Sequence, residues 1–551
     1  GDRERDLSWH RDSVHARLRY RVWKMSSATA DTRAMGRKKS ATAVAKDESA
    51  SSGVGLLVFT TVVGVGAGVG LYFWNRLKRR KASPQSRRCS KGVAMTHEQL
   101  DVLEGYKSKC TMSKDQLNAL VDDFLRRMNE GLRSEGQMLK QLPSYVERMP
   151  NGEEAGEFLA IDLGGTNVRV VKVVLEDRKV KEVVAHEDAI PKALMRGTTK
   201  GLFDFIAKQV KLFMARHSAR PTASGTKVPI GFTFSYPMKQ TGIKNGELIC
   251  WTKGFDIKDT LGKDLVGLLE ASMREQEVEG EVFAILNDTV GTLAASRFAD
   301  QDTQLGVILG TGSNAAYIES KGNISKLSAG GSDGGRMIVN IEWGNFKSDH
   351  LPYLAEDREI DEGTPNRGSQ HYEKMISGMY LGEMARRACL RASREANLFG
   401  GTQRRRLEKP WSFPTSLVSE IDGLGSGRLP QVKKALSKAL DILEASVSDG
   451  CAHFVTEVCR LIGDRSATLA AAGVAAIYRY LTQSGQVALD QRFVVAVDGG
   501  LFEHYPRYKD RMDKTFGDLL GGQAKRVELV HSPDGSGIGS AVIAAAAATS
   551  R

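Results

Sequence analysis

The sequence predicts a mixed α/β protein built from two related lobes. Two apolar, β-rich segments, 158–175 and 305–319, each contain a glycine-rich turn between two strand-like runs, which is the pattern of a β-hairpin. Each segment opens a longer stretch in which strand-like and helix-like patterns alternate. The recurrence of this hairpin indicates an internal duplication. The length of 551 residues agrees with two lobes, because a single hydrophobic core seldom grows so large.

The N-terminal segment differs in charge from the rest of the chain. Residues 1–96 contain 20 Lys and Arg against seven Asp and Glu, whereas the whole chain has a net charge of +12, so the remainder is close to neutral. We expect residues 1–52, which are polar and rich in Ser, Ala and Arg, to be a disordered basic leader. A basic charge confined to such a leader points to a membrane or to targeting, and we expect no nucleic-acid partner.

An uncharged stretch at 53–74 is long enough to cross a bilayer as a transmembrane helix. Tyr72 and Trp74 stand at its end, and five Lys and Arg follow within 76–81. The positive-inside rule predicts that this basic cluster, the linker at 75–96 and the body lie in the cytosol. A cleaved signal peptide is the alternative, but the length of the stretch and its positive flank on the C-terminal side argue against it.

The body begins near residue 97, and its first clear element is an amphipathic helix at about 112–134. Four further strand-like runs end in polar or glycine residues. These runs are 228–237, 282–292, 492–502 and 526–539. Ligands of α/β proteins bind at the carboxyl ends of strands, so we expect the functional site there. The chain has no Walker A sequence ending in Gly-Lys-Ser or Gly-Lys-Thr, which argues against a P-loop nucleotide hydrolase.

Three glycine turns are candidate phosphate-binding turns, because backbone N–H groups without side chains admit phosphate oxygens. They are Gly164-Gly165-Thr166, Gly310-Thr311-Gly312 and Gly499-Gly500. An ordinary hairpin turn is the simpler explanation for any one of them alone. Asp162, at the end of its strand-like run, is a candidate for holding Mg²⁺ through water.

A second set of candidates combines amides, carboxylates and hydroxyls near the ends of apolar runs. The set consists of Ser235, Thr252, Lys253, Asn287, Asp288, Asn314, Glu342, Gln370 and Glu373. Side chains of these types suit a ligand whose hydroxyls both donate and accept hydrogen bonds, such as a sugar. Asn287 and Asp288 are the most informative, because they directly follow the apolar run 282–286. Gln370 and Glu373 are equally well explained by an exposed helix face.

The body resembles the hexokinase family, and in particular its membrane-anchored plant members. The resemblance covers about 97–548 and depends on long, collinear motifs. They are FLAIDLGGTNVRV from 158, GFTFSYP from 231, WTKGF from 251, LNDTVGT from 286, LGTGSNAAY from 309, IEWGNF from 341, EKMISGMYLGE from 373, LAAAG from 469 and DGGLFEHY from 498. The stretches 325–336 and 401–428 match the family poorly.

The resemblance implies a two-lobed actin-like (ribonuclease-H-like) ATPase fold that closes on its substrates. It assigns about 152–288 and a C-terminal helix at about 535–551 to a small lobe. It assigns about 97–151 and 289–534 to a large lobe. The catalytic body then spans 97–551.

The resemblance also implies transfer of the γ-phosphoryl group of MgATP to the 6-hydroxyl of glucose, fructose or mannose, the first step of glycolysis. Asp288 would be the general base, with Lys253 and Arg169 also catalytic. The sugar would be bound by Ser235, Thr252, Lys253, Asn287, Asp288, Asn314, Glu342, Gln370 and Glu373. The nucleotide and its Mg²⁺ would be bound by Asp162, Gly164, Gly165, Thr166, Asn167, Thr311, Gly312, Gly473, Gly499, Gly500 and Ser536, with Asp162 nearest the metal.

Three other functions fit parts of the sequence. A glucose-binding signalling protein without catalysis needs neither Asp288 nor the glycine turns, so their presence argues against it. Another actin-like protein, such as a chaperone ATPase, would lack the sugar-binding set. A kinase for a different sugar stays open. The resemblance places the anchor in the mitochondrial outer membrane, with the plastid envelope as the alternative. We expect a monomer, and the resemblance is also compatible with an additional sugar-sensing role.

Overall fold

The computed structural model describes residues 87–88, 94–165, 167–217, 227–251, 254–327, 334–401 and 405–549. The expected leader, the expected transmembrane segment and most of the expected linker lie outside these residues, as do Thr166, Thr252 and Lys253. From Arg88 onward the described residues belong to one compact unit. None of the helices in the described ranges combines the length and the apolar character needed to cross a membrane.

The first sheet has five strands and contains the hairpin expected at 158–175. Its strands are β4 (Gly156–Leu163), β5 (Asn167–Glu176), β6 (Lys179–Ala189), β7 (Val228–Phe234) and β10 (Gly280–Leu286). They lie in the order β10-β7-β4-β5-β6. The first three run parallel, and the β4–β5 and β5–β6 pairs are antiparallel.

The second sheet repeats this arrangement and contains the hairpin expected at 305–319. Its strands are β11 (Thr303–Leu309), β12 (Ser313–Ser320), β13 (Arg336–Asn340), β14 (Phe493–Asp498) and β15 (Val527–His531), with β3 (Leu142–Pro143) added at one edge. The order is β15-β14-β11-β12-β13-β3, again with three parallel strands followed by antiparallel pairs. The same order and directions in both sheets confirm the predicted duplication.

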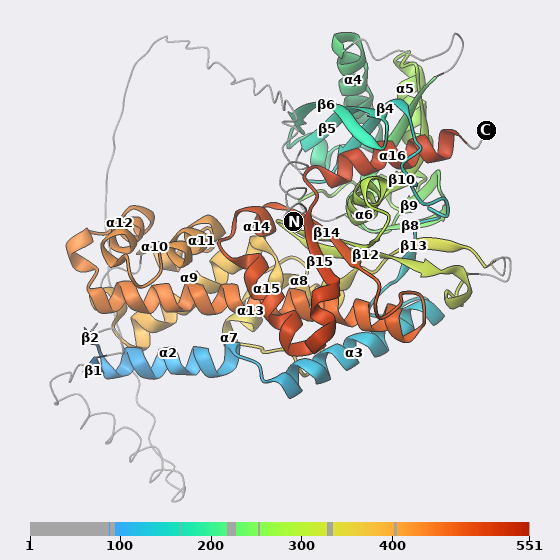
Figure 1. Cartoon of the computed structure of the whole chain (residues 1–551). Helices are drawn as coiled ribbons and strands as arrows, with labels where there is room; N and C mark the ends of the chain where they lie inside the picture. Colours follow the sequence, from blue (N-terminus) through green and yellow to red (C-terminus); the bar gives the residue numbers. More distant parts are fainter. Residues whose placement is uncertain are drawn as a thin grey trace, which may run out of the picture. The chain divides into compact units, whose positions relative to one another are not determined.

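Side chains on β4 alternate between the two faces of the first sheet, as the period of two in a strand requires. Leu159 and Ile161 pack with residues of α4 (Thr199–His217) and α5 (Leu265–Glu275). Phe158 and Ala160 pack on the other face, with residues of α6 (Asp288–Ala299) and α16 (Gly535–Ala548). In Figure 1 the C-terminal helix α16 therefore lies beside strands from the first half of the body.

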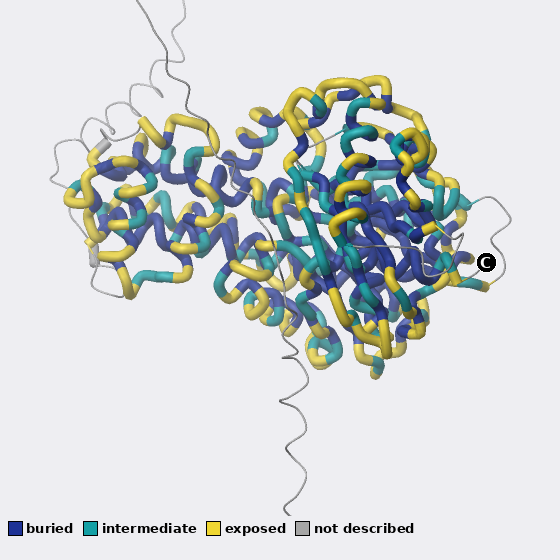
Figure 2. The backbone as a smooth tube through the Cα atoms, turned by 90° about the horizontal axis from the view of Figure 1, so that it is seen from above, coloured by how far each residue is buried: buried dark blue, intermediate teal, exposed yellow. Residues whose placement is uncertain are grey.

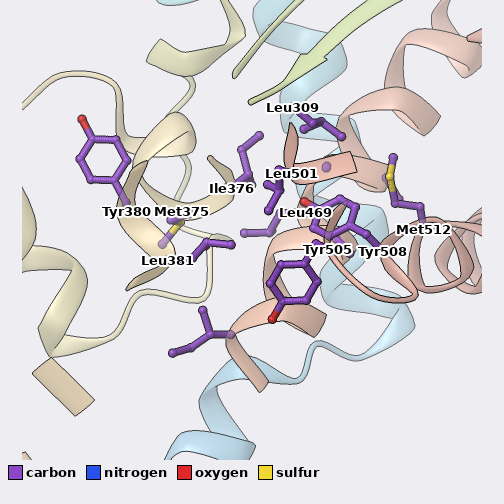
Figure 3. Packing of buried hydrophobic residues seen from close by; sticks show 14 of the residues in the cluster. Leu309, Met375, Ile376, Tyr380, Leu381, Leu469, Leu501, Tyr505, Tyr508 and Met512 are labelled. Atoms are coloured by element: carbon purple, nitrogen blue, oxygen red, sulfur yellow. The ribbon is translucent and has the colours of Figure 1, made fainter. Parts of the chain in front are cut away.

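Helices surround the second sheet and form the largest hydrophobic core. They are α2 (His97–Cys110), α3 (Lys114–Arg133), α7 (Ala355–Glu362), α8 (His371–Ile376), α9 (Gly378–Glu395), α10 (Arg405–Glu408), α11 (Thr415–Leu424), α12 (Leu429–Leu440), α13 (Asp449–Gln483), α14 (Gly500–His504) and α15 (Tyr508–Leu520). The helix expected at 112–134 is α3, which begins after a capping box on Ser113. The 35-residue α13 runs through this core, and most of its residues are buried. In Figure 2 buried segments fill the interior of the described chain and exposed segments lie on its outside. Figure 3 shows residues from α8, α9, α13, α14 and α15 that meet there.

Shorter elements connect the two sheets and their helices. They are β1 (Arg87–Arg88), β2 (Ala94–Met95), β8 (Met238–Gly242), β9 (Asn245–Leu248), η1 (Leu194–Arg196), η2 (Lys258–Thr260), η3 (Lys321–Asn323), η4 (Trp343–Asn345), η5 (Leu398–Gly401), η6 (Glu444–Ser446) and η7 (Gly521–Arg526).

Helices α6 and α16 approach each other through glycines. A Cβ atom added at Gly539 would overlap the backbone carbonyl of Gly291, and one added at Gly291 would lie 2.8 Å from the carbonyl oxygen of Ser536. A side chain at either glycine would therefore force the two helices apart. The contact matters for function because the first residues of both helices carry polar side chains predicted to act in the site.

We expect Gly539→Ala to lower the free energy of unfolding by about 1–3 kcal/mol, because overpacking forces buried backbone to move. Chemical denaturation of the two proteins measures the change. Gly517→Ala is the matched control, because Gly517 lies on the exposed side of α15 with no atom within 4 Å of the added Cβ. The control should be neutral or slightly stabilising, since Ala favours a helix over Gly. Equal stability of the two variants would contradict the close packing.

Candidate active site

Four aspartates from separate parts of the chain gather at the carboxyl ends of parallel strands or just beyond them. Asp162 lies in β4, Asp288 opens α6 directly after β10, Asp498 ends β14, and Asp534 precedes α16. The charges of Asp288 and Asp534 reach both Asp162 and Asp498. The two sheets therefore bring together carboxylates that are up to 372 positions apart in the numbering of the chain, between Asp162 and Asp534.

Burial, helped by the charges of Asp288 and Asp534, raises the pKa of Asp162 to about 6. Burial and the same two neighbours raise the pKa of Asp498 to about 7, although the backbone N–H groups of Gly499 and Gly535 act in the opposite direction. Carboxylates crowded in this way favour a bound cation or a bound proton.

An ion pair and a hydroxyl hold this group of carboxylates in place. The Arg169 guanidinium donates two hydrogen bonds to the Asp534 carboxylate, one of them at 2.7 Å from Nη2 to Oδ2. Ser536 Oγ donates to Asp162 Oδ2 at 2.8 Å. Asp162 Oδ1 is buried and has no hydrogen-bond partner among the described residues. A buried carboxylate oxygen without a protein partner is suited to a hydrated Mg²⁺ ion.

A network of amides lies next to Asp288. Asn287 caps α6, and its Oδ1 accepts a hydrogen bond from the Thr289 backbone at 3.0 Å. The Asn314 amide, at the start of β12, donates to Asn287 at 3.3 Å and to Asn340 at 2.9 Å. The Asn314 and Asn340 amides both donate to Glu342 Oε1, at 3.3 and 2.9 Å. These groups suit a ligand with several neutral hydroxyls.

Gln370 and Glu373 lie beside this network and are not on a solvated helix face. Glu373 Oε2 accepts a hydrogen bond from the Ser313 backbone N–H at 2.9 Å. The Gln370 side-chain oxygen packs so closely on Gly344 that a Cβ there would overlap it. Gly344 follows Glu342 by two residues, so these contacts join Gln370 and Glu373 to the same region. Ser235 is also buried, and a Cβ added at Gly164 would lie 3.5 Å from its Oγ.

The predicted glycine turns differ in their need for glycine. Gly499 has a φ of 116°, and a Cβ there would lie 2.5 Å from the Leu309 carbonyl oxygen, so backbone packs directly on backbone. Gly312 lies so close to Glu373 that a Cβ would lie 2.6 Å from its carboxylate. Gly165, in contrast, leaves open space around its α-carbon, which suits a turn that admits a ligand, and a Cβ added at Gly500 would make only an ordinary contact, 3.5 Å from His504 Cδ2. Thr311 accepts a backbone hydrogen bond from Met379 at 3.1 Å.

The structure places Gly473, which was predicted to contact the nucleotide, beside Tyr372 and Trp343 in the helical core. Gly473 is buried within α13, where a Cβ would lie 2.8 Å from the Tyr372 hydroxyl and 3.0 Å from the Trp343 ring. Its surroundings are those of a core packing position. Asn167, also expected at the nucleotide, starts β5 and donates its amide to Glu187 on β6.

Three polar residues of the site were not among the predicted ones. Asn340 joins the amide network, while Asp498 and Asp534 join the carboxylates. Each follows an apolar strand-like run, which is the signal that identified Asp162 and Asp288. Beside Asp498 the prediction named Gly499 and Gly500, and beside Asp534 it named Ser536.

The raised pKa of Asp498 makes the free energy of unfolding depend on pH. Its pKa of about 7 in the folded protein exceeds the ordinary value of 3.8, so the folded state holds the proton longer than the unfolded state. The Asp498 contribution to stability is therefore present at low pH and is lost as pH rises toward 7. We expect Asp498→Asn to raise the melting temperature at pH 8 more than at pH 5, as measured by differential scanning calorimetry. An equal effect at both values would show that Asp498 does not titrate in this range.

Comparison with known proteins agrees with this site. Two models of the hexokinase family match the chain, one at residues 102–298 and the other at residues 304–546. Hexokinase-2 of Solanum tuberosum is 41% identical over 450 residues, covering 81% of this chain and 90% of the relative. Hexokinase-1 of Spinacia oleracea is 42% identical with the same coverage.

A solved structure gives the same result for the fold. The hexokinase of Schistosoma mansoni complexed with glucose superposes with a TM-score of 0.72 and 32% identity, covering 81% of this chain and 98% of that one. The similarity extends over both sheets and nearly the whole length of these relatives. The chain therefore belongs to the hexokinase family and is a hexose kinase.

Proposed function

We propose that this chain transfers the γ-phosphoryl group of MgATP to the 6-hydroxyl of glucose and related hexoses, with Asp288 as the general base. The observation that carries the proposal is the position of Asp288 at the junction of two groups. On one side, through Asn287, lies the amide network, and on the other lie the crowded carboxylates. A base at this junction is placed between a polyhydroxyl ligand and a charged one.

In this reaction the hexose 6-oxygen forms a bond to the γ-phosphorus while the bond from that phosphorus to the bridging oxygen of ATP breaks. The 6-hydroxyl proton passes to the Asp288 carboxylate, and ADP leaves with the bridging oxygen. The amide network, with Gln370 and Glu373, would bind the remaining hydroxyls and align the 6-oxygen. Such alignment supplies a large part of the acceleration. Ser235, Thr252 and Lys253 keep their predicted roles at the sugar, with Lys253 also near the transferred group.

The glycine turns would bind the phosphates, with Arg169 and Thr311 beside them. The buried, unpartnered Oδ1 of Asp162 fits a hydrated Mg²⁺ ion. Bound there with ATP, Mg²⁺ would neutralise part of the phosphate charge. The proposed small lobe, about 152–288 with 535–551, carries Asp162 and Asp288. The proposed large lobe carries Asn314, and closure of the two would exclude water from the base.

We expect Asp288→Asn to reduce kcat by about 10²–10⁴-fold, because the amide cannot take the hydroxyl proton. Glucose binding, measured by isothermal titration calorimetry on the same samples, should be retained. Asp510→Asn, at an exposed position of α15, is the control and should leave both quantities unchanged. Glucose binding without turnover in the unmodified chain would favour a sugar-responsive signalling protein, and a fully active Asp288→Asn variant would refute the assignment of the base.

We further propose that residues 53–74 anchor the chain in a membrane with its body in the cytosol. The uncharged length of this segment and the basic residues at 76–81 support the proposal. The mitochondrial outer membrane is our first choice of membrane, and the plastid envelope is the alternative. We expect the catalytic body to act as a monomer.

Protease added to intact mitochondria should degrade the body of the unmodified chain. Replacing the five basic residues at 76–81 by Gln should leave a fraction of the body protected, because the charge that retains this flank in the cytosol is gone. Immunoblotting of the protected fraction measures the change, with detergent-lysed organelles as the control. Full protection of the unmodified body would contradict the topology, and recovery of the chain in plastids alone would favour the other membrane.

A further inference from the structure

Two aromatic side chains that the reaction does not use meet directly behind the predicted hexose residues. Tyr353, in the loop before α7, packs against His371, the first residue of α8. The ring centroids lie 6.1 Å apart and the rings are nearly perpendicular, at 82°. His371 is the neighbour of Gln370 and lies two positions before Glu373. The pair is therefore attached to the segment that carries both predicted hexose residues.

This pair has polar atoms whose hydrogen-bonding capacity is unused. In the part of the chain that the structure describes, neither the Tyr353 hydroxyl nor His371 Nε2 has a hydrogen-bond partner, although both atoms are buried. The His371 imidazole also interacts with the backbone of Gly368. Buried polar groups without partners are costly, so they are uncommon where only packing is required.

The loop before Gln370 is held by a buried lysine. Lys374 Nζ donates to Asp361 at 2.7 Å and to the carbonyls of Asn366 and Ser369 at 2.9 Å each. Both oxygens of Asp361 in turn accept the Gly368 N–H at 3.0 Å. These bonds fix the loop on one side. On the other side of the loop, the His371 side chain interacts with the backbone of Gly368.

Gln370 needs such support because its backbone is in the left-handed region, with φ 57° and ψ 37°. A non-glycine residue in this region costs about 1–3 kcal/mol and persists only when its surroundings hold it there. Loss of the contacts of His371 would therefore allow the Gln370 backbone to leave the left-handed region. Because α8 begins at His371, Glu373 would be displaced with it.

We propose that His371, in its neutral form and packed on Tyr353, is a positioning residue that holds Gln370 and Glu373 in the geometry that binds the hexose. The inference rests on the proposed function, since it assumes that these two residues contact the sugar. His371 itself does not contact substrate. Its effect is on hexose affinity and not on the phosphoryl-transfer step.

The charges around the pair favour the neutral imidazole. Burial lowers the pKa of His371 below its ordinary value of 6.5, and Lys347 and Lys374 act in the same direction. Asp361, on α7, acts in the opposite direction, but Lys374 already pairs with it. Tyr353 faces carboxylates as well as the imidazole, and burial raises its pKa to about 12, so its hydroxyl keeps its proton. These carboxylates are Asp349, Asp357, which pairs with Arg465, and Asp361.

The sign of the pH dependence follows from the lowered pKa. Above pH 6.5 the imidazole is neutral and the positioning effect is complete. As pH falls through the lowered pKa of His371, a third positive charge joins those of Lys347 and Lys374, and hexose affinity should fall. Asp162 and Asp498 have pKa values of about 6 and about 7, so the ratio between a variant and the unmodified chain is the useful quantity.

The test compares His371→Phe with the unmodified full chain, using glucose as the ligand in isothermal titration calorimetry and in steady-state kinetics. At pH 8 the dissociation constant and the KM for glucose should rise about tenfold, while kcat and the KM for ATP stay within about twofold. The tenfold ratio should shrink toward one as pH falls through the lowered pKa of His371, because the unmodified chain then loses the neutral imidazole itself. Tyr353→Leu removes the ring contact with His371 and should weaken glucose binding in the same direction. The double variant should lose less than the sum of the two single effects.

His350→Phe, an exposed histidine three positions before Tyr353, is the matched control and should change none of these constants. An unchanged glucose dissociation constant in His371→Phe at pH 8 would overturn the proposal. Equal losses in glucose affinity, ATP affinity and melting temperature would also overturn it, because they indicate a structural role alone. Absence of glucose binding in the unmodified chain would instead refute the proposed function itself, and the inference with it.

Discussion

The contact between α6 and α16 is the packing constraint on which the site depends. Gly291 and Gly539 allow the two helix backbones to touch, and no larger residue fits at either position. As a result the N-terminus of α6, with Asp288, and the N-terminus of α16, with Ser536, open at the same place. Helix N-termini attract negative charge through their free N–H groups and aligned dipoles. One backbone contact thus brings together the proposed base and the helix end that carries Ser536, which is predicted to contact the nucleotide.

The crowding of carboxylates at this point has a cost that the fold offsets only in part. Arg169 pairs with Asp534, and Ser536 donates to Asp162, but Asp162 and Asp498 still have raised pKa values. Such a group is more stable when a cation is bound. Stability and ligand binding are therefore linked in this molecule, because the ligand that completes the site also relieves its electrostatic repulsion.

The hexose side of the site stores a different kind of strain. Glu342 and Gln370 both have left-handed backbones, with φ of 57° each, although neither is glycine. Glu342 is held by the amides of Asn314 and Asn340, and Gln370 by the loop that Lys374 and His371 support. Side chains on strained backbones have few alternative positions, so they present fixed hydrogen-bonding groups to a ligand. Rigid presentation lowers the entropic cost of binding.

Much of the architecture could be read from the sequence, because it depends on patterns within a few residues. The hairpins at 158–175 and 305–319 and the helix at 112–134 follow from apolar periodicity and turn residues, and the structure contains all three. Asp162 and Asp288 were identifiable for a similar reason, as carboxylates at the ends of apolar runs. The family motifs extended this reading to the rest of the site.

From the sequence alone came the two hairpins, four further strand-like runs, the helix at 112–134, the duplication and the residue types available for chemistry, since each depends on local spacing. Only the tertiary structure decided which of those residues meet. Asp534 reaches Arg169 because α16 returns to the first sheet, and Asn340 joins Asn314 because β13 pairs with β12. The aromatic rings beside Gly473 could not be predicted either, because a glycine within an apolar helix does not show what lies against it. The physical reason is the same throughout: contacts between distant segments follow from the packing of whole sheets and helices, and no local pattern records them.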